Sequence, residues 1–257
     1  MELLLEERGP VALLTLNRPS RLNALSTSLL QALEKALNEV EARLHLRAVV
    51  LAGAGRVFCA GADIAELKSK AGALAAAAYI EQIQRVVNRV EALPLPVIAA
   101  VHGLAFGGGF ELALAADLIV AEDQTQFALP EVKIGVIPGA GGTQRLPRLV
   151  GRNRAKELLF SGDSIDAHRA EAWGIVNRVV PAGEAQSEAL SWAASLAERA
   201  PVALRLAKRA VNRGLETSLE AGLDLEMEAI LILFGTRDQK EGMQAFLEKR
   251  APQFMGE

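Results

Sequence analysis

Two glycine-rich segments, each between a short apolar run and helix-like sequence, constrain the fold of this chain more than any other feature. Residues 58–64 (FCAGADI) follow the run Arg47–Ala52, and residues 102–111 (HGLAFGGGFE) follow Val97–Val101. Short continuous apolar runs of this kind are typical of parallel strands that are buried on both faces. The unit of strand, glycine turn and helix recurs at roughly fifty residues, which favours a layered spiral or an open α/β sheet.

The rest of the first 190 residues alternates between strand-like and helix-like patterns. Apolar residues recur at helical spacing from Ser26 to Leu44, and Ser26 is a suitable N-cap. The other elements we expect are a strand over Gly9–Asn17, a long helix from the Cys59–Asp63 turn to just before Pro94, a turn over Gly103–Gly109, helices over Phe110–Ala115, over Arg152–Phe160 and from Ile165, and strands over Leu118–Ala121 and Val176–Val180.

After Pro181 the pattern changes to consecutive helices with short breaks. We expect a core of residues 1–190 that holds the functional residues, and a helical C-terminal region of residues 191–257. The run Ile230–Phe234 is too apolar to face water, so this region should pack on another surface, and an adjacent subunit is one candidate. The expected helices here cover Ala189–Arg199, Val202–Gly214, Leu219–Phe234 and Glu241–Arg250.

Composition excludes several classes of protein. The 257 residues, 51% hydrophobic and 23% charged, suit a large domain whose core needs neither disulfides nor metals. A net charge of −3 argues against a nucleic-acid partner. No run of about 18 apolar residues is free of charges, which argues against a membrane span. The single cysteine, Cys59, and the absence of a basic, apolar leader fit a cytoplasmic protein.

The glycines at 107–109 suit an anion-binding turn. Backbone N–H groups at a helix start point outward and meet the positive end of the helix dipole. The turn at 58–64 can expose another N–H group, and two such groups aimed at one carbonyl oxygen form an oxyanion hole. The glycine triplet at 107–109 can equally mark a flexible turn where Cβ atoms would clash, and for the triplet alone this interpretation stays open.

Two glutamates accompany these turns. Glu111 lies about one helical turn past Gly108 among apolar neighbours, and Glu131 follows Pro130 twenty residues later. If both share one pocket, their ionisations couple, which supplies an acid and a base near neutral pH. Taken singly, Glu111 can be a helix N-terminal acid and Glu131 a surface acid. Taken together with the turns, they indicate enolate chemistry on a thioester.

Other reactive residues carry less weight. We expect His102, at a strand end, to be structural, and Cys59 to pack in the core. The chain offers too few ligands to predict a metal site. A basic stretch is expected to be a solvated face or a subunit contact, with phosphate binding as the alternative; it comprises Arg145, Arg148, Arg152, Arg154 and Lys156.

Over essentially its whole length the chain resembles the enoyl-CoA hydratase/isomerase (crotonase) superfamily. Five segments in order carry the resemblance: residues 17–25 (NRP and NAL), 59–64 (CAGADI), 105–111 (AFGGGFE), 135–146 (GVIPGAGGTQRL) and 238–250, where Asp238, Glu241-Gly242-Met243, Phe246 and Lys249-Arg250 match. The resemblance implies an α/β fold, a spiral of ββα turns followed by a helical trimerisation region. Assembly as a homotrimer or as a dimer of trimers is implied as well.

The resemblance also implies a site. It places the oxyanion-hole N–H groups at Ala62 and Gly108 and the acid–base pair at Glu111 and Glu131. The substrate would be an acyl-CoA thioester, and no metal or redox cofactor is needed because the thioester itself stabilises the α-carbanion. The CoA part is expected near Ala60, Ala62, Asp63 and Ile64, with Arg21 and Lys249 as further candidates, the latter from a neighbouring subunit.

The activity so implied is that of an enoyl-CoA hydratase, a lyase that adds water to a 2-trans-enoyl-CoA. Two alternatives remain. One is isomerisation of a 3-enoyl-CoA, which needs one base and no bound water. The other is a methylglutaconyl-CoA hydratase that also binds RNA, through a helix after Asp63 that carries Lys68, Lys70, Arg85 and Arg89. The sequence does not fix the acyl chain length or the pathway.

Overall fold

The main sheet has six strands in the order β1-β2-β3-β4-β6-β9 in a computed structural model that describes residues 1–70 and 72–257. β1 pairs antiparallel with β2, and the remaining neighbours are parallel. The central strands are buried along almost their whole length, as continuous apolar runs predict. The strands cover Leu3–Arg8 (β1), Val11–Leu16 (β2), Ala48–Gly53 (β3), Val97–Val101 (β4), Leu118–Glu122 (β6) and Arg178–Val180 (β9).

A second, smaller sheet lies beside the glycine turns. It contains β5 (Leu104–Phe106), β7 (Gln126–Ala128) and β8 (Ile165–Asp166) in the order β5-β7-β8. The prediction of an uninterrupted turn over residues 103–109 was therefore wrong. The prediction of a helix from residue 165 was early by two residues, because α7 begins at residue 167. Strands of two or three residues form through pairing with distant segments, which leaves little local pattern.

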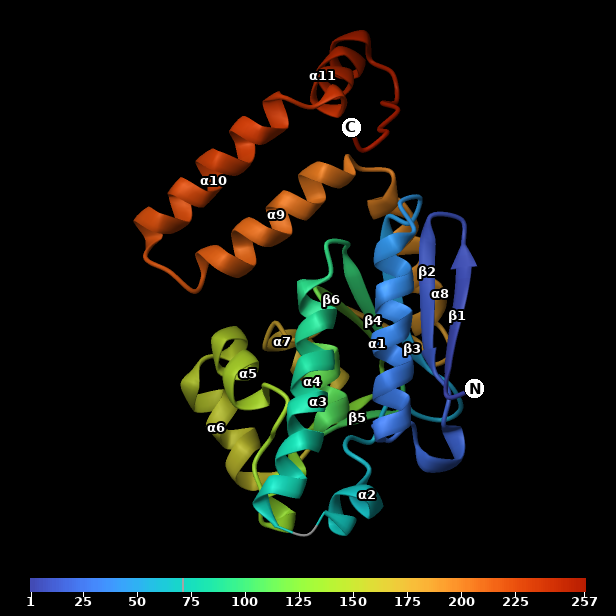
Figure 1. Cartoon of the computed structure of the whole chain (residues 1–257), viewed down its shortest axis with the longest axis vertical. Helices are drawn as coiled ribbons and strands as arrows, with labels where there is room; N and C mark the ends of the chain where they lie inside the picture. Colours follow the sequence, from blue (N-terminus) through green and yellow to red (C-terminus); the bar gives the residue numbers. More distant parts are fainter. Residues whose placement is uncertain (71) are drawn as a thin grey trace.

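The helices cover the sheets and form the C-terminal arm (Figure 1). Ser26 caps α1 as predicted, since its side chain accepts a hydrogen bond from the N–H of Leu29. Two short 3-10 helices cover Pro19–Arg21 (η1) and Pro130–Ile134 (η2). The α-helices are α1 (Thr27–Ala42), α2 (Ile64–Ser69), α3 (Ala73–Ala92), α4 (Gly108–Leu114), α5 (Gly142–Val150), α6 (Arg152–Ser161), α7 (Ala167–Ala172), α8 (Ala185–Ala197), α9 (Pro201–Gly214), α10 (Leu219–Phe234) and α11 (Arg237–Glu248).

The long helix predicted from Asp63 to Pro94 is two helices, α2 and α3. Lys70 leaves helical geometry with ψ near 104°, and Gly72, just before α3, has φ near 85°. A positive φ favours glycine and ends a right-handed helix. Ala71, which the predicted helix included, lies outside the described residues. Among the described residues, no helix is long and apolar enough to cross a membrane.

The N-terminal strand β1 was not predicted from the sequence. Only Leu3 of this strand is fully buried, while Glu6, Glu7 and Arg8 face solvent at the sheet edge. Gly9, with φ near 61°, forms the turn to β2. An edge strand of this kind has no continuous apolar run, and charged residues on it protect the exposed edge from pairing with other chains.

Helix α8 lies across residue 190, where we expected the C-terminal region to begin. Ala185, Ala189 and Ala193 are buried against the second face of the main sheet, opposite α1 and α3. In Figure 1, α9, α10 and α11 instead project beyond the layered core. The division at residue 190 itself stays a prediction. The exposed apolar residues of α10 are Leu219, Leu223, Met227, Ile230, Leu231, Ile232 and Phe234.

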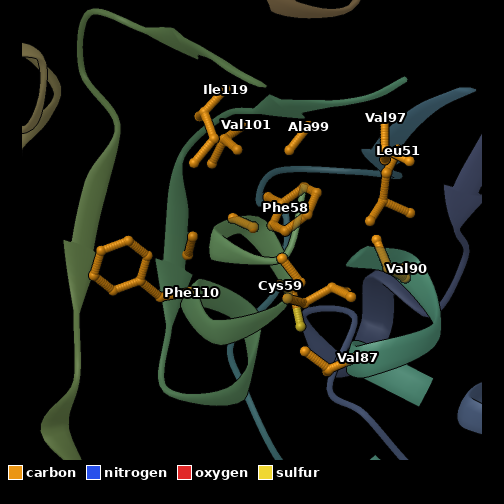
Figure 2. Close-up of a cluster of buried hydrophobic side chains, with 14 of the residues drawn as sticks. Leu51, Phe58, Cys59, Val87, Val90, Val97, Ala99, Val101, Phe110 and Ile119 are labelled. Atoms are coloured by element: carbon orange, nitrogen blue, oxygen red, sulfur yellow. The ribbon is translucent and has the colours of Figure 1, made fainter. Parts of the chain in front are cut away.

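The main core lies between β3, β4, α3 and α4, directly behind the glycine turns. Figure 2 shows Phe58, Cys59 and Phe110 within this cluster of buried side chains. Cys59 packs there as predicted, and burial raises the pKa of its thiol to about 12. Residues 58–59 begin the first turn, and Phe110 immediately precedes Glu111. Packing of these side chains therefore fixes both turns from behind.

Candidate active site

Gly107 connects β5 to α4 with a backbone that only glycine adopts easily. Its φ is near 50°, and its N–H donates to the carbonyl of Ala128 in β7. A Cβ atom at this position would lie 2.7 Å from Oε1 of Glu131. The turn is thus tight both because of its backbone geometry and because the Glu131 carboxylate occupies the adjacent space.

The two predicted N–H donors lie next to each other. Ala62 forms a parallel bridge with Leu25, in which the flanking groups, the carbonyl of Gly61 and the N–H of Asp63, make the hydrogen bonds. The N–H of Ala62 therefore points away from Leu25. A Cβ atom on Gly108 would lie 3.5 Å from that nitrogen. Neither the N–H of Ala62 nor that of Gly108 donates to any residue in the part of the chain that the structure describes.

Glu111 is buried, with only 2% of its surface exposed, and it is anchored by backbone groups. Its Oε1 atom accepts hydrogen bonds of 2.7 Å from the N–H groups of Ala140 and Gly142. Burial raises the pKa of Glu111 above its ordinary value, and the two N–H groups and the charge of Arg145 partly oppose this rise. One carboxylate oxygen is thus fixed, while Oε2 accepts no hydrogen bond from the residues that the structure describes.

Glu131 lies in η2 and has no comparable anchor. Its Oε2 atom is buried, with no hydrogen-bond partner among the described residues. Burial, with a further contribution from the charge of Glu111, raises the pKa of Glu131 to about 7. The coupling predicted for two glutamates in one pocket is therefore present, and the two carboxylates are in different environments.

Both glutamates border one cavity of about 1000 Å³. Its wall also includes Ala62 and Gly108, so all four predicted catalytic positions meet at one place. Apolar side chains from α2, α3 and the segment after Glu131 line most of the remaining wall: Ile64, Leu67, Ile80, Ile83, Val132, Ile134, Val136, Ile137 and Pro138. The cavity can therefore hold a largely apolar group beside two carboxylates and two N–H donors.

The residues expected to bind CoA do not all lie at the cavity. Ala60 and Ile64 line the cavity. The carboxylate of Asp63 caps α2 and forms an ion pair of 3.2 Å with Arg18, so its side chain is engaged within the protein. Arg21 is exposed at the end of η1.

Lys249 is not near this cavity in the same chain. It ends α11 in a left-handed conformation with φ near 55°. In Figure 1, α11 lies at the opposite end of the long axis from α2, which lines the cavity. The placement is compatible with the expectation that Lys249 would act on a neighbouring subunit, which stays a prediction.

Several other polar residues that the sequence singled out have structural partners. His102 contacts the carbonyl of Gly55 at 3.0 Å. Among the described residues, no group of three or more His, Cys, Asp or Glu side chains could hold a metal ion. Within the predicted basic stretch, Arg145 pairs with Glu91, Arg148 pairs with Glu216, and Arg154 stacks on Trp173. Its role as a solvated face or a subunit contact stays a prediction.

Sequence reasoning missed the loop that anchors Glu111. Ala140 and Gly142 were noted only as part of a family-like segment, and Tyr79 was not singled out, although its hydroxyl accepts from the N–H of Asp63. The signal for the loop was Gly139-Ala140-Gly141-Gly142 before a helix-like segment. No local pattern indicates which carboxylate the N–H groups of such a loop will meet.

Comparison with known proteins places this geometry in a family. The model of the enoyl-CoA hydratase/isomerase family matches residues 6–257. A short-chain-enoyl-CoA hydratase of Clostridium acetobutylicum is 43% identical over 255 residues, covering 96% of this chain and 95% of that protein.

Solved structures agree with this assignment. The crystal structure of an enoyl-CoA hydratase from Bacillus anthracis has a TM-score of 0.97 and 40% identity, and each chain is covered completely. A second, from Geobacillus kaustophilus, has a TM-score of 0.95 and 44% identity, covering 100% of this chain and 99% of that one. The crotonase-like fold predicted from the sequence is confirmed, and the chain belongs to the enoyl-CoA hydratase/isomerase family.

Proposed function

We propose that this protein is an enoyl-CoA hydratase, which adds water reversibly to a 2-trans-enoyl-CoA thioester to give the 3-hydroxyacyl-CoA. The observation that carries the proposal is the meeting of two glutamates, in unlike environments, at one apolar cavity. Family membership supports it, since the relatives from Clostridium acetobutylicum and Bacillus anthracis are called enoyl-CoA hydratases. CoA is part of the substrate, and the proposed chemistry requires no resident cofactor.

In the proposed mechanism the thioester oxygen binds between the N–H groups of Ala62 and Gly108. Negative charge grows on that oxygen as water attacks C3, so the two donors stabilise the transition state more than the substrate. Loss of one donor of this kind typically costs about 3–4 kcal/mol in the barrier. Their neighbouring positions support this role, as does the lack of an acceptor for either N–H group among the described residues.

The two glutamates divide the proton transfers. Glu111, with Oε1 held by two N–H groups, is the base: its free Oε2 takes a proton from the water whose oxygen bonds to C3. Glu131, whose pKa of about 7 keeps it partly protonated, gives its proton to C2. Return of the proton from Glu111 to Glu131 through solvent resets the site. General acid–base help of this kind contributes roughly a hundred- to ten-thousand-fold.

For the CoA part we propose contacts with the turn at Ala60 to Ile64, of which Ala60, Ala62 and Ile64 line the cavity. Arg21 is exposed and able to reach a phosphate from solvent. Asp63 contributes through its backbone position, because its carboxylate is already paired with Arg18. A cytoplasmic location remains a prediction.

We further propose that the chain assembles as a homotrimer or a dimer of trimers through α9 to α11, with Lys249 reaching the CoA site of a neighbour. The exposed apolar residues of α10 support an interface there. Light scattering coupled to size-exclusion chromatography tests this: a mass of three or six chains of 27.3 kDa is expected, and a monomer contradicts it.

RNA binding is not proposed. Three of the four cations that an RNA-binding helix would use are paired with acids: Lys70 with Glu66, Arg85 with Glu34, and Arg89 with Glu41. A phosphate backbone would have to displace these carboxylates, whereas strong RNA binding relies on unpaired cations along one face.

Hydration of crotonyl-CoA, followed by loss of the enoyl-thioester absorbance, tests the proposed activity. Wild type should turn over rapidly, and Glu111→Gln and Glu131→Gln should each lose at least about a hundred-fold in kcat. An isomerase relying on Glu131 alone would instead retain much activity on a 3-enoyl-CoA in the Glu111→Gln variant. A folded wild type inactive on enoyl-CoA esters of several chain lengths contradicts the hydratase assignment.

A further inference from the structure

Arg145 is held behind the loop that anchors Glu111. Its side chain is 16% exposed, and its guanidinium faces three acceptors. Nη1 donates to the carbonyl of Ala140 at 3.0 Å, and Nη2 donates to Asn88 at 2.8 Å and to Glu91. Nε also donates to Glu91, at 3.2 Å. A planar fork of donors fixed on several sides in this way has little freedom to move.

The loop itself is folded around this guanidinium. Gly141 has φ near 111°, and a Cβ atom on it would lie 2.1 Å from Nη1 of Arg145. The carbonyl of Gly141 accepts from the backbone N–H of Arg145 at 2.7 Å, which fixes the start of α5. The loop conformation and the arginine position therefore depend on each other.

The opposite side of the same loop holds the catalytic base. The N–H groups of Ala140 and Gly142 both point to Oε1 of Glu111, and the side chain of Arg145 donates to the carbonyl of Ala140, one of the two carbonyls between them. Any rotation of the 140–142 segment that releases the carbonyl from Arg145 also turns the N–H groups away from Glu111. The guanidinium and the carboxylate are thus connected through one short stretch of backbone.

We propose that Arg145 is a positioning residue for hydration: through the 140–142 loop it keeps Oε1 of Glu111 bound by two N–H groups and Oε2 aimed at the water. The inference rests on the hydratase function proposed above. The charge of Arg145 also lowers the pKa of Glu111, in opposition to the effect of burial. Glu91, which pairs with the guanidinium, limits this effect.

The test compares Arg145→Gln with Arg148→Gln on crotonyl-CoA. Arg148 is a matched control because it lies on the same helix and pairs with the exposed Glu216, and its other contacts are to Gln144. We expect Arg145→Gln to lower kcat by roughly ten- to a hundred-fold, as losses of supporting residues typically do, with KM little changed. Arg148→Gln should resemble wild type.

The pH profile separates positioning from general damage. A base must be deprotonated, so the acid limb of kcat/KM rises as pH rises through the pKa of Glu111. Removing the positive charge of Arg145 and loosening the two N–H donors raises that pKa. The acid limb of Arg145→Gln should therefore move to higher pH, whereas a variant that is merely less folded keeps the wild-type limb.

A double-mutant cycle completes the test. In the Glu111→Gln background, Arg145→Gln should cause almost no further loss, because the group it positions is already gone. An equal loss in both backgrounds, or wild-type kcat and pH profile in Arg145→Gln, overturns the proposal. Absence of hydration in wild type would instead overturn the proposed function, so the two failures are distinguishable.

Arg145→Lys covers the case in which the glutamine variant does not fold. The lysine ammonium keeps the positive charge but cannot donate hydrogen bonds to Ala140, Asn88 and Glu91 at the same time. A several-fold loss of kcat, with the acid limb close to that of wild type, is expected. Wild-type kcat in the folded lysine variant overturns the proposal as well.

Discussion

The two glutamates of the cavity are held by regions of opposite character. Glu111 lies in a helix, and the 140–142 loop binds one of its oxygens with two N–H groups. Glu131 lies in a short 3-10 helix, and its buried Oε2 atom has no partner among the described residues. Burial raises the pKa of both carboxyl groups, and the N–H groups of the 140–142 loop oppose that rise at Glu111 but not at Glu131. Unequal surroundings of this kind are what assign base and acid to two chemically identical side chains.

Among the glycine substitutions near the two glutamates, Gly107→Ala should have the largest effect, and it acts on the surroundings of Glu131. The new Cβ would lie 2.7 Å from Oε1 of Glu131, at a backbone φ near 50° that alanine disfavours. We expect kcat/KM for crotonyl-CoA to fall by at least about a hundred-fold, because the acid is displaced. Gly174→Ala is the matched control, since Gly174 also has a positive φ but its Cβ would meet nothing within 4 Å. Equal losses in both variants would attribute the effect to backbone strain alone.

Gly142→Ala should disturb the Glu111 side to a smaller degree. Its Cβ would lie 3.1 Å from Oε1 of Glu111, at a position whose φ is not in the left-handed region, and the N–H donor is retained. We expect kcat to fall about ten-fold, because a shifted base loses part of the roughly hundred- to ten-thousand-fold that acid–base catalysis contributes. Steady-state kinetics of Gly142→Ala and Gly107→Ala, measured side by side, show which variant loses more activity. A larger loss for Gly142→Ala contradicts the expected order.

The pH dependence of kcat/KM should show the titration of Glu131 separately from that of Glu111. Because the pKa of Glu131 is raised to about 7, its proton is lost as pH rises through that value. We expect kcat/KM to decline above pH about 7, as it reports the free enzyme. The Glu131→Gln variant, measured with its residual activity, should lack this decline. A wild-type profile that stays flat to pH 9 contradicts the assignment of Glu131 as the acid.

The smallest effect concerns stability. A carboxyl group whose folded pKa is raised from 4.5 to about 7 is favourable to folding below pH 4.5 and loses that advantage as pH rises through 7. Glu131→Gln removes this titration. Its Tm should therefore exceed that of wild type at pH 8, with the difference shrinking toward pH 4.5. Scanning calorimetry at several pH values checks this, and a constant difference across the window contradicts it.

Much of the fold was predictable where local pattern and tertiary role agree. The boundaries of β4 coincide with the predicted run, and Ser26 caps α1 as expected. The break between α2 and α3 was not predicted, because helical periodicity continues across it and only Gly72 marks it. Strand β5 was missed because three residues next to glycines carry too little pattern of their own.

The residues that border the cavity were predictable from the sequence, but the residues that hold them in place were not. Glu111, Glu131, Ala62 and Gly108 were all named from the sequence, and all border one cavity. The role of Arg145 was not foreseen, because in the sequence it belongs to a basic stretch. Its partners Asn88 and Glu91 lie more than fifty residues away, on α3. Only folding brings that helix against the 140–142 loop.

The position of α8 has a consequence for how the chain is made. β2, β3 and β4 are complete by residue 101, yet α8, which packs on their second apolar face through Ala185, Ala189 and Ala193, comes more than eighty residues later. Because synthesis proceeds at about 5–20 residues per second, that face of the sheet stays without α8 for some seconds. A nascent chain that stalls before residue 185 presents a sheet of valines, leucines and alanines to other nascent chains and to chaperones.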